Sequence, residues 1–381
     1  MRILISAGEA SGDLYASKLV EAIKARHPET EFFGCAGPRM QAAGVRAIVD
    51  SRSLAVVGIV EVLGHLPRIW REFRKLTAAA KTERPDLAVL TDSPDFHLRV
   101  AKRLHRAGVP VVYLIAPQAW AWREGRVRTM RATVSRLLCI FPFEEEFFKK
   151  RGVPTTYIGH PLASVVKPSL SRQEFESRFG FIPSTRVLAL LPGSRRGEVS
   201  RHIPTVVEAA QAIREKHPVT PVLALPHGFG FDSAAFREVV LTAGIRVIEG
   251  FTWDVLAHSE LALAASGTVT IEAALLGVPM VTFYRVTSLS WILGRSLVKA
   301  PFLTMVNLVA GRRIVPELIQ HEMTAERIAV EACRLLEKPE QMATMRAGLA
   351  EVAGHLQTGR DPMLVAAECV DQVLEGLTKA R

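Results

Sequence analysis

The residues best suited to chemistry in this sequence lie in a short turn of small side chains. A buried strand is predicted at 261–265, and Ser266 and Gly267 join it to a helix that begins at Thr268. The first N–H groups of a helix have no intrahelical partner and can bind an anion. One turn into the helix, Glu272 could accept two vicinal hydroxyl groups. These four residues are candidate contacts for a diphosphate and a ribose, although the turn alone also fits an ordinary strand–helix connection with Ser266 as N-cap.

A second turn supplies positive charge. The segment PGSRRGE follows a buried strand predicted at 187–191. Gly193 allows a ligand to approach the backbone closely and, with Ser194, is a candidate substrate contact. Arg195 could hold a diphosphate, because a guanidinium group binds two phosphate oxygens at once. The alternative is a solvated arginine near a helix start, a position where the helix dipole disfavours cations.

A carboxylate lies where a general base would be needed. In DSPDF, Asp92 follows a buried strand predicted at 87–91, and a carboxylate at such a strand end can accept a proton from an alcohol. Asp95 falls in the first turn of the next helix, where the helix dipole alone accounts for an acidic residue. The earlier turn GEASGD follows the first strand and offers Gly8 and Ser11 as candidate substrate contacts, but it matches a dinucleotide fingerprint only loosely.

No pattern in the sequence indicates a bound metal or cofactor, and we expect neither. The chain has no D-x-D triplet, no H-E-x-x-H, no Cys/His ligand spacing and neither a G-x-S-x-G nor a Walker motif. Asn307 is the single asparagine. A composition that avoids asparagine could retain this one for a left-handed turn or for a hydrogen bond to a ligand, and the sequence leaves both open.

The overall charge favours anionic partners. Lys and Arg number 48 against 38 Asp and Glu, a net charge of +10, which suits nucleotides, phosphorylated lipids or an anionic membrane surface. We expect no nucleic acid, because no basic run or nucleic-acid-binding motif is present. The four cysteines are far apart, as is typical of buried thiols in a reducing compartment. The short apolar start predicts a first strand rather than a signal peptide, and no uncharged stretch is long enough to span a membrane, so a cytoplasmic location is expected.

These turns all follow strands that alternate with helices, as in parallel, doubly wound sheets. Strands are predicted at 3–7, 32–36, 87–91, 111–115, 137–141 and 155–158, and in a second series at 187–191, 222–225, 246–248, 261–265 and 278–283. The first helix is predicted to end near residue 27, and further helices to cover 200–217, 232–243 and 268–276. The segment AGPRM is interpreted as a turn. After residue 324, only helices are expected. The predicted fold class is α/β, with two Rossmann-like domains that have parallel sheets and face each other across a cleft, followed by a helical C-terminus.

The domain boundaries follow from a lapse in this alternation between residues 161 and 183. We place an N-terminal domain at 1–165 and a C-terminal domain at 184–358, with a last helix at about 360–381 that could pack back on the first domain. Within the lapse, the capping box of Ser171 and Glu174 predicts a short helix that ends at Gly180.

Many short motifs occur together in the order found in one known family. They are GEASGD, AGPRM, LAVVGIVEVLG, DSPDF, WAW, PFE, IGHPL, LLPGSR, ASGT with Glu272, and a Tyr-Arg pair at 284–285. The sequence resembles the lipid-A-disaccharide synthase family over most of its length, up to about residue 316. The resemblance implies a GT-B glycosyltransferase fold. It also implies transfer of 2,3-diacylglucosamine from UDP-diacylglucosamine to the 6-hydroxyl of diacylglucosamine 1-phosphate, giving a β(1→6) disaccharide and UDP.

The same resemblance assigns roles to residues. The family's essential aspartate falls on Asp92, its essential arginine on Arg195 and its asparagine on Asn307. The implied mechanism is an inverting transfer in which Asp92 accepts the proton of the attacking hydroxyl, Arg195 and the helix start at 267–268 stabilise the departing diphosphate, and Glu272 holds the ribose. The chain departs from the family pattern at His97, at Met305–Val306 and in APQAWAW.

An apolar segment at 54–66, followed by an amphipathic stretch with clustered arginines, predicts a contact with lipid. For an arbitrary enzyme, a core helix followed by a surface helix would explain the pattern. Acylated substrates would instead favour an interfacial segment that contacts acyl chains and an anionic membrane surface. We therefore expect a peripheral protein on the cytoplasmic face of the inner membrane, with a second apolar segment at 289–299 assisting. The predicted contacts are Val56, Val57, Leu63, Leu66 and Trp70.

Two other functions fit parts of the pattern. One is a UDP-N-acetylglucosamine 2-epimerase, an isomerase built on the same two-domain plan, although its usual His-Arg-Arg-Glu pattern is absent and the nearest stretch is residues 194–198. The other is a peripheral lipid-binding protein without catalytic activity, for which Asp92 and Arg195 would be dispensable.

Overall fold

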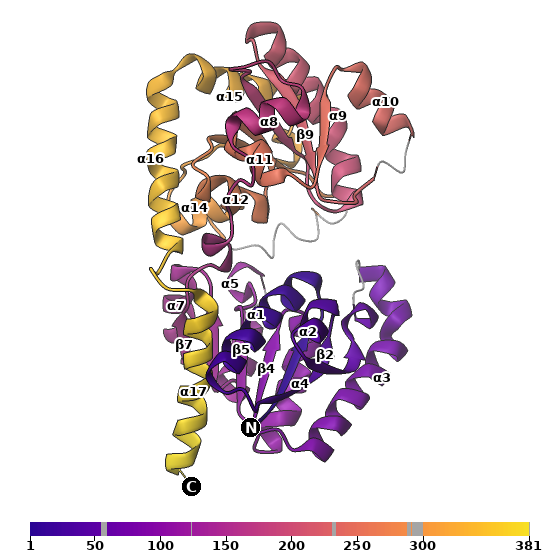
Figure 1. Cartoon of the computed structure of the whole chain (residues 1–381), viewed down its shortest axis with the longest axis vertical. Coiled ribbons are helices and arrows are strands. Elements are labelled where there is room, and N and C mark those ends of the chain that lie inside the picture. The colour runs from indigo at the N-terminus through magenta and orange to yellow at the C-terminus, as the bar shows by residue number, and fades with distance from the viewer. Residues whose placement is uncertain (55–58, 123, 231–233, 288–290, 292–299, 381) are drawn as a thin grey trace. The chain divides into compact units, whose positions relative to one another are not determined.

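The computed structural model describes residues 1–54, 59–122, 124–230, 234–287, 291 and 300–380. The chain forms two compact units: Met1–Pro161 with Leu356–Arg381, and Leu162–His355. Figure 1 shows a parallel sheet with helices in each unit. The helix at the C-terminus therefore belongs to the unit that the N-terminus begins.

The first unit is built on a seven-stranded parallel sheet with the order β3-β2-β1-β4-β5-β6-β7. Its strands are β1 (Arg2–Ala7), β2 (Glu31–Ala36), β3 (Val45–Asp50), β4 (Leu87–Thr91), β5 (Val111–Leu114), β6 (Arg136–Cys139) and β7 (Thr155–Tyr157). The central strands are continuous apolar runs because helices cover both faces of the sheet. The strand order reverses between β1 and β4, which are hydrogen-bonded neighbours with Ala7 opposite Thr91.

The helices of the first unit connect these strands. They are α1 (Ala10–Arg26), α2 (Pro38–Ala42), α3 (Ile59–Glu83), α4 (Pro94–Arg106), α5 (Ala119–Trp122), α6 (Gly125–Thr133), α7 (Pro142–Lys149) and α17 (Pro362–Ala380), with 3₁₀ turns η1 (Ser51–Ser53) and η2 (Pro161–Ser164), the second at the junction of the units. The last helix, α17, packs against α1. Asp371 on α17 accepts hydrogen bonds from Arg26 (2.7 Å) and His27 (2.9 Å) at the end of α1.

The second unit has a six-stranded parallel sheet with the order β10-β9-β8-β11-β12-β13. Its strands are β8 (Val187–Leu191), β9 (Thr220–Leu225), β10 (Arg246–Glu249), β11 (Ser259–Ala265), β12 (Met280–Tyr284) and β13 (Glu317–Ile319). Here the order reverses between β8 and β11. Both sheets are therefore doubly wound, and the α/β prediction with parallel sheets is confirmed.

The helices of the second unit are α8 (Arg172–Phe179), α9 (Arg196–Lys216), α10 (Ala234–Thr242), α11 (Thr252–Ala257), α12 (Thr268–Leu275), α14 (Met305–Ala310), α15 (Ala325–Glu337) and α16 (Pro339–Leu356), with one 3₁₀ turn, η3 (Gln320–Glu322). The predicted capping box is present, since Ser171 and Glu174 bond to each other's backbone at the start of α8. Gly180 ends that helix in the left-handed conformation, with φ +65°. The purely helical end of the chain is confirmed as well.

Two strands and the segment AGPRM differ from the prediction. The sheet-edge strands β3 and β13 were not predicted; β3 is interrupted by the exposed residues Arg46 and Ala47, and β13 is only three residues long. AGPRM is not a simple turn, because α2 begins within it. Asp13 caps α2 by accepting hydrogen bonds from the N–H groups of Gly37, Arg39 and Met40 at 2.9, 3.0 and 3.1 Å. The cap comes from α1, so the local sequence of AGPRM could not reveal it.

The helix α3 divides into a buried and an exposed part. Phe73 and Leu76 are buried in the core of the first unit. Leu66 and Trp70 are 46% and 55% exposed, and the Trp70 ring stacks on Phe73 with centroids 5.3 Å apart. Among the other predicted lipid contacts, Val56 and Val57 lie outside the described residues, as does most of 289–299; for Leu63, only its place in α3 is described. In the described part of the chain, no helix is long and apolar enough to cross a membrane.

Candidate functional site

The predicted site residues of the second unit follow the two strands between which the strand order reverses. Leu191 at the end of β8 pairs with Ala264 near the end of β11. The loop after β8 carries Arg195, and the turn after β11 carries Ser266, Gly267 and Thr268. Parallel strands present their carboxyl ends at one edge, and ligands of open α/β sheets bind at such a reversal. The fold thus brings together two turns that are about 70 residues apart in the sequence.

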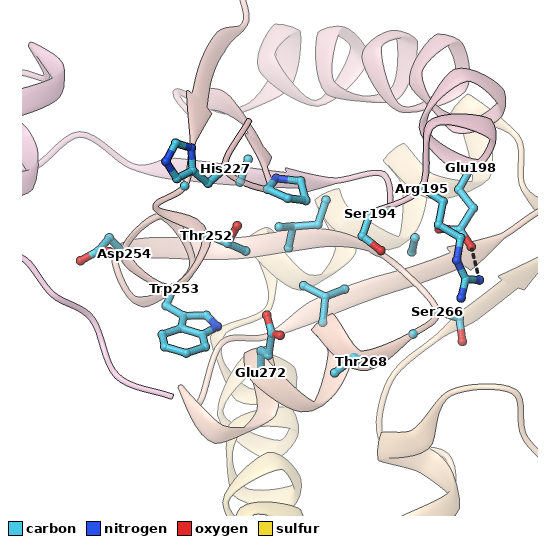
Figure 2. Close-up of a pocket in the computed structure, with 18 of the residues that line it drawn as sticks. Ser194, Arg195, Glu198, His227, Thr252, Trp253, Asp254, Ser266, Thr268 and Glu272 are labelled. Atoms are coloured by element: carbon cyan, nitrogen blue, oxygen red, sulfur yellow. Dashed lines mark ion pairs between the residues drawn. The ribbon is translucent and has the colours of Figure 1, made fainter. Parts of the chain in front are cut away.

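A cavity of about 800 Å³ lies at this edge (Figure 2). All seven residues predicted from the two turns line it: Gly193, Ser194, Arg195, Ser266, Gly267, Thr268 and Glu272. This size is typical of a pocket for a small organic ligand. The structure therefore joins both sequence-predicted turns in one pocket.

The carboxylate of Glu272 lies inside this pocket beside Trp253 (Figure 2). Burial raises the pKa of Glu272, and a hydrogen bond from the Trp253 side chain opposes that rise. The indole N–H is a donor only, so it fixes the direction of the carboxylate. A carboxylate held in this way can accept hydrogen bonds from hydroxyl groups of a ligand.

Arg195 is the N-cap residue of α9, and its side chain is 67% exposed. Its guanidinium nitrogen Nη1 lies 3.6 Å from Oε1 of Glu198, which also accepts a 3.0 Å hydrogen bond from the Tyr284 hydroxyl. An exposed ion pair contributes little stability, so Arg195 can exchange Glu198 for a ligand phosphate. Gly193 has φ +126°, and a Cβ there would lie 2.9 Å from Oε2 of Glu198. The backbone conformation favours glycine at this position.

The turn before α12 differs from the expectation in one detail. Gly267, not Ser266, is the N-cap residue of α12, so the alternative with Ser266 as N-cap is wrong. The hydroxyl of Ser266 donates a 3.0 Å hydrogen bond to the carbonyl oxygen of Leu303 instead. Gly267 and Thr268 are exposed at the helix start. The first N–H groups of α12 therefore remain accessible to an anion.

Several pocket residues were missed by the sequence analysis. They come from the loop after β9, from α11 and from the segment before α8, and they include Lys167, His227, Thr252, Trp253 and Asp254. Asp254 is structural, because its Oδ1 accepts 2.7 Å hydrogen bonds from the backbone N–H groups of Ser169 and Leu170. One available signal was FTWD at 251–254, which follows the strand predicted at 246–248 and so lies at the same edge of the sheet.

Asp92 occupies the corresponding edge of the first unit, after β4 and next to β1. Its carboxylate accepts hydrogen bonds from the N–H groups of Gly8 (2.8 Å) and Glu9 (3.0 Å) at the start of α1. A Cβ at Gly12 would lie 1.7 Å from Oδ2 of Asp92. GEASGD thus forms a cradle for this carboxylate, which explains the glycines without a dinucleotide. Ser11 is exposed on the first turn of α1.

Burial raises the pKa of Asp92 to about 7, and the hydrogen bonds from Gly8 and Glu9 limit the rise. Its side chain remains 14% exposed, so the carboxylate can still meet a ligand. A carboxyl group with a pKa near neutrality suits proton transfer, because it can both accept and release a proton at the working pH.

The backbone of Asp92 is held in an unusual conformation. Asp92 and Ser93 have φ values of +53° and +34°, which is uncommon outside glycine and clusters at functional sites. The carbonyl oxygen of Asp92 accepts hydrogen bonds from the Tyr113 hydroxyl (2.6 Å) and from Nδ1 of His97 (3.0 Å). Burial lowers the pKa of His97 to about 4, so this ring is neutral and forms no ion pair with Asp92. Its Nε2 therefore accepts a hydrogen bond from Ser6 (2.7 Å).

The remaining candidates have structural partners. Asp95 pairs with Arg126 at 2.8 Å, in agreement with its structural interpretation. Asn307 lies within α14, so the left-handed turn is wrong. Its fully buried side chain accepts hydrogen bonds from the N–H groups of Ile314 and Val315 and donates to the carbonyl of Val315 and to Glu317. These four bonds satisfy the amide, and Asn307 does not line the described pocket.

Across the described residues, no group of three or more His, Cys, Asp or Glu side chains is arranged to hold a metal ion. Positive charge at the pocket of the second unit comes from Arg195, Lys167 and backbone N–H groups. The chemistry that this arrangement can perform is the binding of a phosphorylated ligand with vicinal hydroxyl groups.

Comparison with solved structures defines the class of protein. UDP-N-acetylglucosamine 2-epimerase from Neisseria meningitidis superimposes with a TM-score of 0.64 over 99% of this chain and 100% of that one, at 14% identity. The calicheamicin glycosyltransferase CalG4 superimposes with a TM-score of 0.59 over 98% of each chain, at 17% identity. Identities this low establish the fold alone. Two doubly wound parallel units are the architecture of the GT-B class.

Sequence comparison establishes the family. A family model for lipid-A-disaccharide synthetase matches residues 3–363. The lipid-A-disaccharide synthases of Solibacter usitatus and Geobacter metallireducens are 58% and 45% identical, covering 98% and 100% of this chain and 98% of each relative. This chain therefore belongs to the lipid-A-disaccharide synthase family. It is an enzyme, a glycosyltransferase of lipid A biosynthesis.

Proposed function

We propose that this glycosyltransferase moves 2,3-diacylglucosamine from UDP to the 6-hydroxyl of 2,3-diacylglucosamine 1-phosphate, with inversion at the anomeric carbon. The observation that carries the proposal is the pocket of the second unit, in which Arg195, the start of α12 and Glu272 come together. The first unit would bind the acylated acceptor, and the second unit would bind the UDP-sugar.

Binding of the UDP-sugar donor would depend on groups that bind phosphate and hydroxyl. The guanidinium group of Arg195 and the free N–H groups at Gly267 and Thr268 would bind the diphosphate and stabilise it as it leaves. Glu272, oriented by Trp253, would accept hydrogen bonds from the two ribose hydroxyls. Each of these groups is a donor to phosphate or an acceptor from hydroxyl, as the two parts of a nucleoside diphosphate require.

Activation of the acceptor hydroxyl would depend on Asp92. Its ionised carboxylate would accept the proton of the 6-hydroxyl while that oxygen attacks the anomeric carbon from the side opposite the diphosphate. The O–H bond and the bond from the anomeric carbon to the diphosphate oxygen break as the new C–O bond forms. The proton passes to Asp92 and the electron pair leaves with UDP, so the transfer needs no further reactant.

One assay tests the proposed substrates and products. The protein is incubated with UDP-diacylglucosamine and the acylated acceptor, and disaccharide and UDP are followed by mass spectrometry. Formation of both products in equal amounts supports the proposal. Absence of disaccharide, or release of UDP without it, would contradict the proposed substrates.

Chelation is expected to leave turnover unchanged. Arg195 and backbone N–H groups would meet the charge of the leaving diphosphate, so no divalent ion is needed for that task. Turnover is measured after incubation with EDTA and again after addition of excess magnesium chloride. A strong loss that magnesium or another metal restores would overturn the metal-free mechanism.

We also propose that the exposed part of α3 contacts an anionic membrane surface on the cytoplasmic face of the inner membrane. Leu66 and Trp70 present large apolar side chains to solvent, and Arg68, Arg71 and Arg74 are exposed nearby. An apolar anchor beside arginines is typical of an interfacial helix. Such a surface would bring the protein to acylated substrates.

The double variant Leu66→Ser/Trp70→Ser is expected to bind vesicles that contain phosphatidylglycerol several-fold more weakly, because it removes apolar surface from the interface. Vesicle co-sedimentation measures this loss, and UDP binding should persist. Leu241→Ser is the matched control, since Leu241 is 56% exposed on α10 of the other unit. Equal vesicle binding by the two variants would contradict the membrane proposal.

A further inference from the structure

The end of β12 connects the two turns that line the pocket. The N–H group of Ser266 donates a 2.8 Å hydrogen bond to the carbonyl oxygen of Phe283. The hydroxyl of Tyr284, the next residue, donates to Glu198 on α9. The backbone of Arg285 lies 3.1 Å from the ring of His202, also on α9. The turn before α12 and the start of α9 are therefore fixed to the same three residues.

His202 supplies the most buried of these connections. Its side chain has no exposed surface. Nδ1 lies 2.7 Å from the carbonyl oxygen of Pro192, which can only accept, so Nδ1 carries a hydrogen. Nε2 lies 3.1 Å from both the amide nitrogen and the carbonyl oxygen of Arg285, so the ring is linked to that residue whether or not Nε2 carries a hydrogen. The ring thus connects Pro192, the first residue of the loop at 192–195 (the Arg195 loop), to Arg285, which directly follows β12.

The surroundings hold this ring in place. Glu198 and His202 are four residues apart, so they lie on the same face of α9. The rings of Phe283 and Tyr284 pack edge-on against His202, each with centroids 5.5 Å away. The side chain has little freedom to move, and its two hydrogen bonds consequently transmit the position of β12 to the loop at 192–195.

We propose that His202 is a positioning residue that sets the spacing between the Arg195 loop and the start of α12, so that both bind one diphosphate. His202 does not line the pocket and acts through the backbone of Pro192 and Arg285. A diphosphate has two phosphoryl groups and can bridge the two elements, whereas a monophosphate cannot. The inference rests on the proposed function, in which this pocket binds UDP.

The test compares UDP with UMP by titration calorimetry on the full chain. In His202→Leu both hydrogen bonds are lost, and we expect UDP to bind roughly 10- to 100-fold more weakly, while UMP affinity changes by less than about threefold. A role in stability alone would lower the affinity for both nucleotides equally or for neither. The readout is therefore the ratio of the two dissociation constants.

Two conservative variants keep the test informative if the leucine variant does not fold. In His202→Asn the side-chain amide lies where Nδ1 lay and retains the hydrogen bond to Pro192. In His202→Gln the longer side chain reaches the position of Nε2 and retains the hydrogen bond to Arg285. Each is expected to lose part of the preference for UDP over UMP. The inference would be overturned if folded His202→Leu kept the wild-type ratio of the UDP and UMP dissociation constants. It would also be overturned if His202→Asn and His202→Gln both folded and both kept that ratio.

His217→Leu is the matched control. His217 is the C-cap residue at the other end of α9, its side chain is 13% exposed, and it does not line the pocket. Nε2 of His217 is buried without a hydrogen-bond partner among the described residues, so its replacement should leave the UDP/UMP ratio unchanged. If the wild-type protein bound no UDP, the proposed donor would be wrong. If it bound UDP and the His202 variants bound UDP equally well, only the role of His202 would be wrong.

Discussion

The variant Asp92→Asn is expected to turn over roughly 10²- to 10⁴-fold more slowly than the wild-type enzyme, as removal of a general base does. The amide cannot accept the proton of the attacking hydroxyl. It also replaces one of the two oxygens that accept hydrogen bonds from Gly8 and Glu9, so a loss of about 1–2 kcal/mol in the free energy of unfolding is expected. Turnover is measured with both substrates saturating, and folding is checked by circular dichroism.

Asp13→Asn is the control that separates catalysis from helix capping. Asp13 is buried and, like Asp92, accepts hydrogen bonds from backbone N–H groups at the start of a helix, here α2. Its substitution should lower stability by a similar amount while affecting turnover far less. Near-normal turnover in folded Asp92→Asn, or an equal loss in both variants, would remove Asp92 from the role of base.

The pH dependence gives a second measurement of the same role. The pKa of Asp92 is raised to about 7, so the carboxyl group is increasingly protonated as the pH falls below that value. A base acts only when it is ionised, and kcat/KM is therefore expected to decrease about tenfold per pH unit on the acid side and to level off above pH 7. His97, with its pKa lowered to about 4, stays neutral throughout this range. The acid limb should be absent from the residual activity of Asp92→Asn.

The second large effect is expected for Arg195→Ala, which should lose about 10²- to 10³-fold in kcat/KM, comparable to the loss of a preorganised charge donor. The guanidinium group would contact the diphosphate before and during bond cleavage, so UDP affinity should fall together with the rate. The side chain is 67% exposed and its partner Glu198 is also bonded to Tyr284. Stability should therefore change little.

Arg196→Ala provides the comparison. Arg196 is the adjacent arginine, and it donates to the carbonyl oxygen of Phe229 and does not line the pocket. Calorimetry with UDP and a steady-state assay should show a small effect of Arg196→Ala and a large one of Arg195→Ala. Unchanged UDP binding by Arg195→Ala would contradict the assignment of Arg195 to the diphosphate.

The sequence alone determined most of the elements and the edge of the sheet at which the candidate site residues lie. Runs such as 187–191 and 261–265 are apolar throughout, as buried parallel strands must be, and small residues and helix starts follow them. Strands of this kind expose their carboxyl ends at one edge, so the residue pattern by itself places Arg195 and Thr268 at that edge. The capping box at Ser171 was equally predictable because its partners are three residues apart.

The tertiary structure decided which of these side chains have partners and how each one ionises. Asp92 meets the N–H group of Gly8, 84 residues away, and its raised pKa results from burial that no local pattern encodes. Trp253 orients Glu272 although it lies on a different helix. Asn307 matched a family position, yet its amide is satisfied within the fold. Sequence patterns are local, whereas hydrogen bonds and desolvation depend on the packing of segments far apart in the chain, and this packing separated the pocket residues from those that only support it.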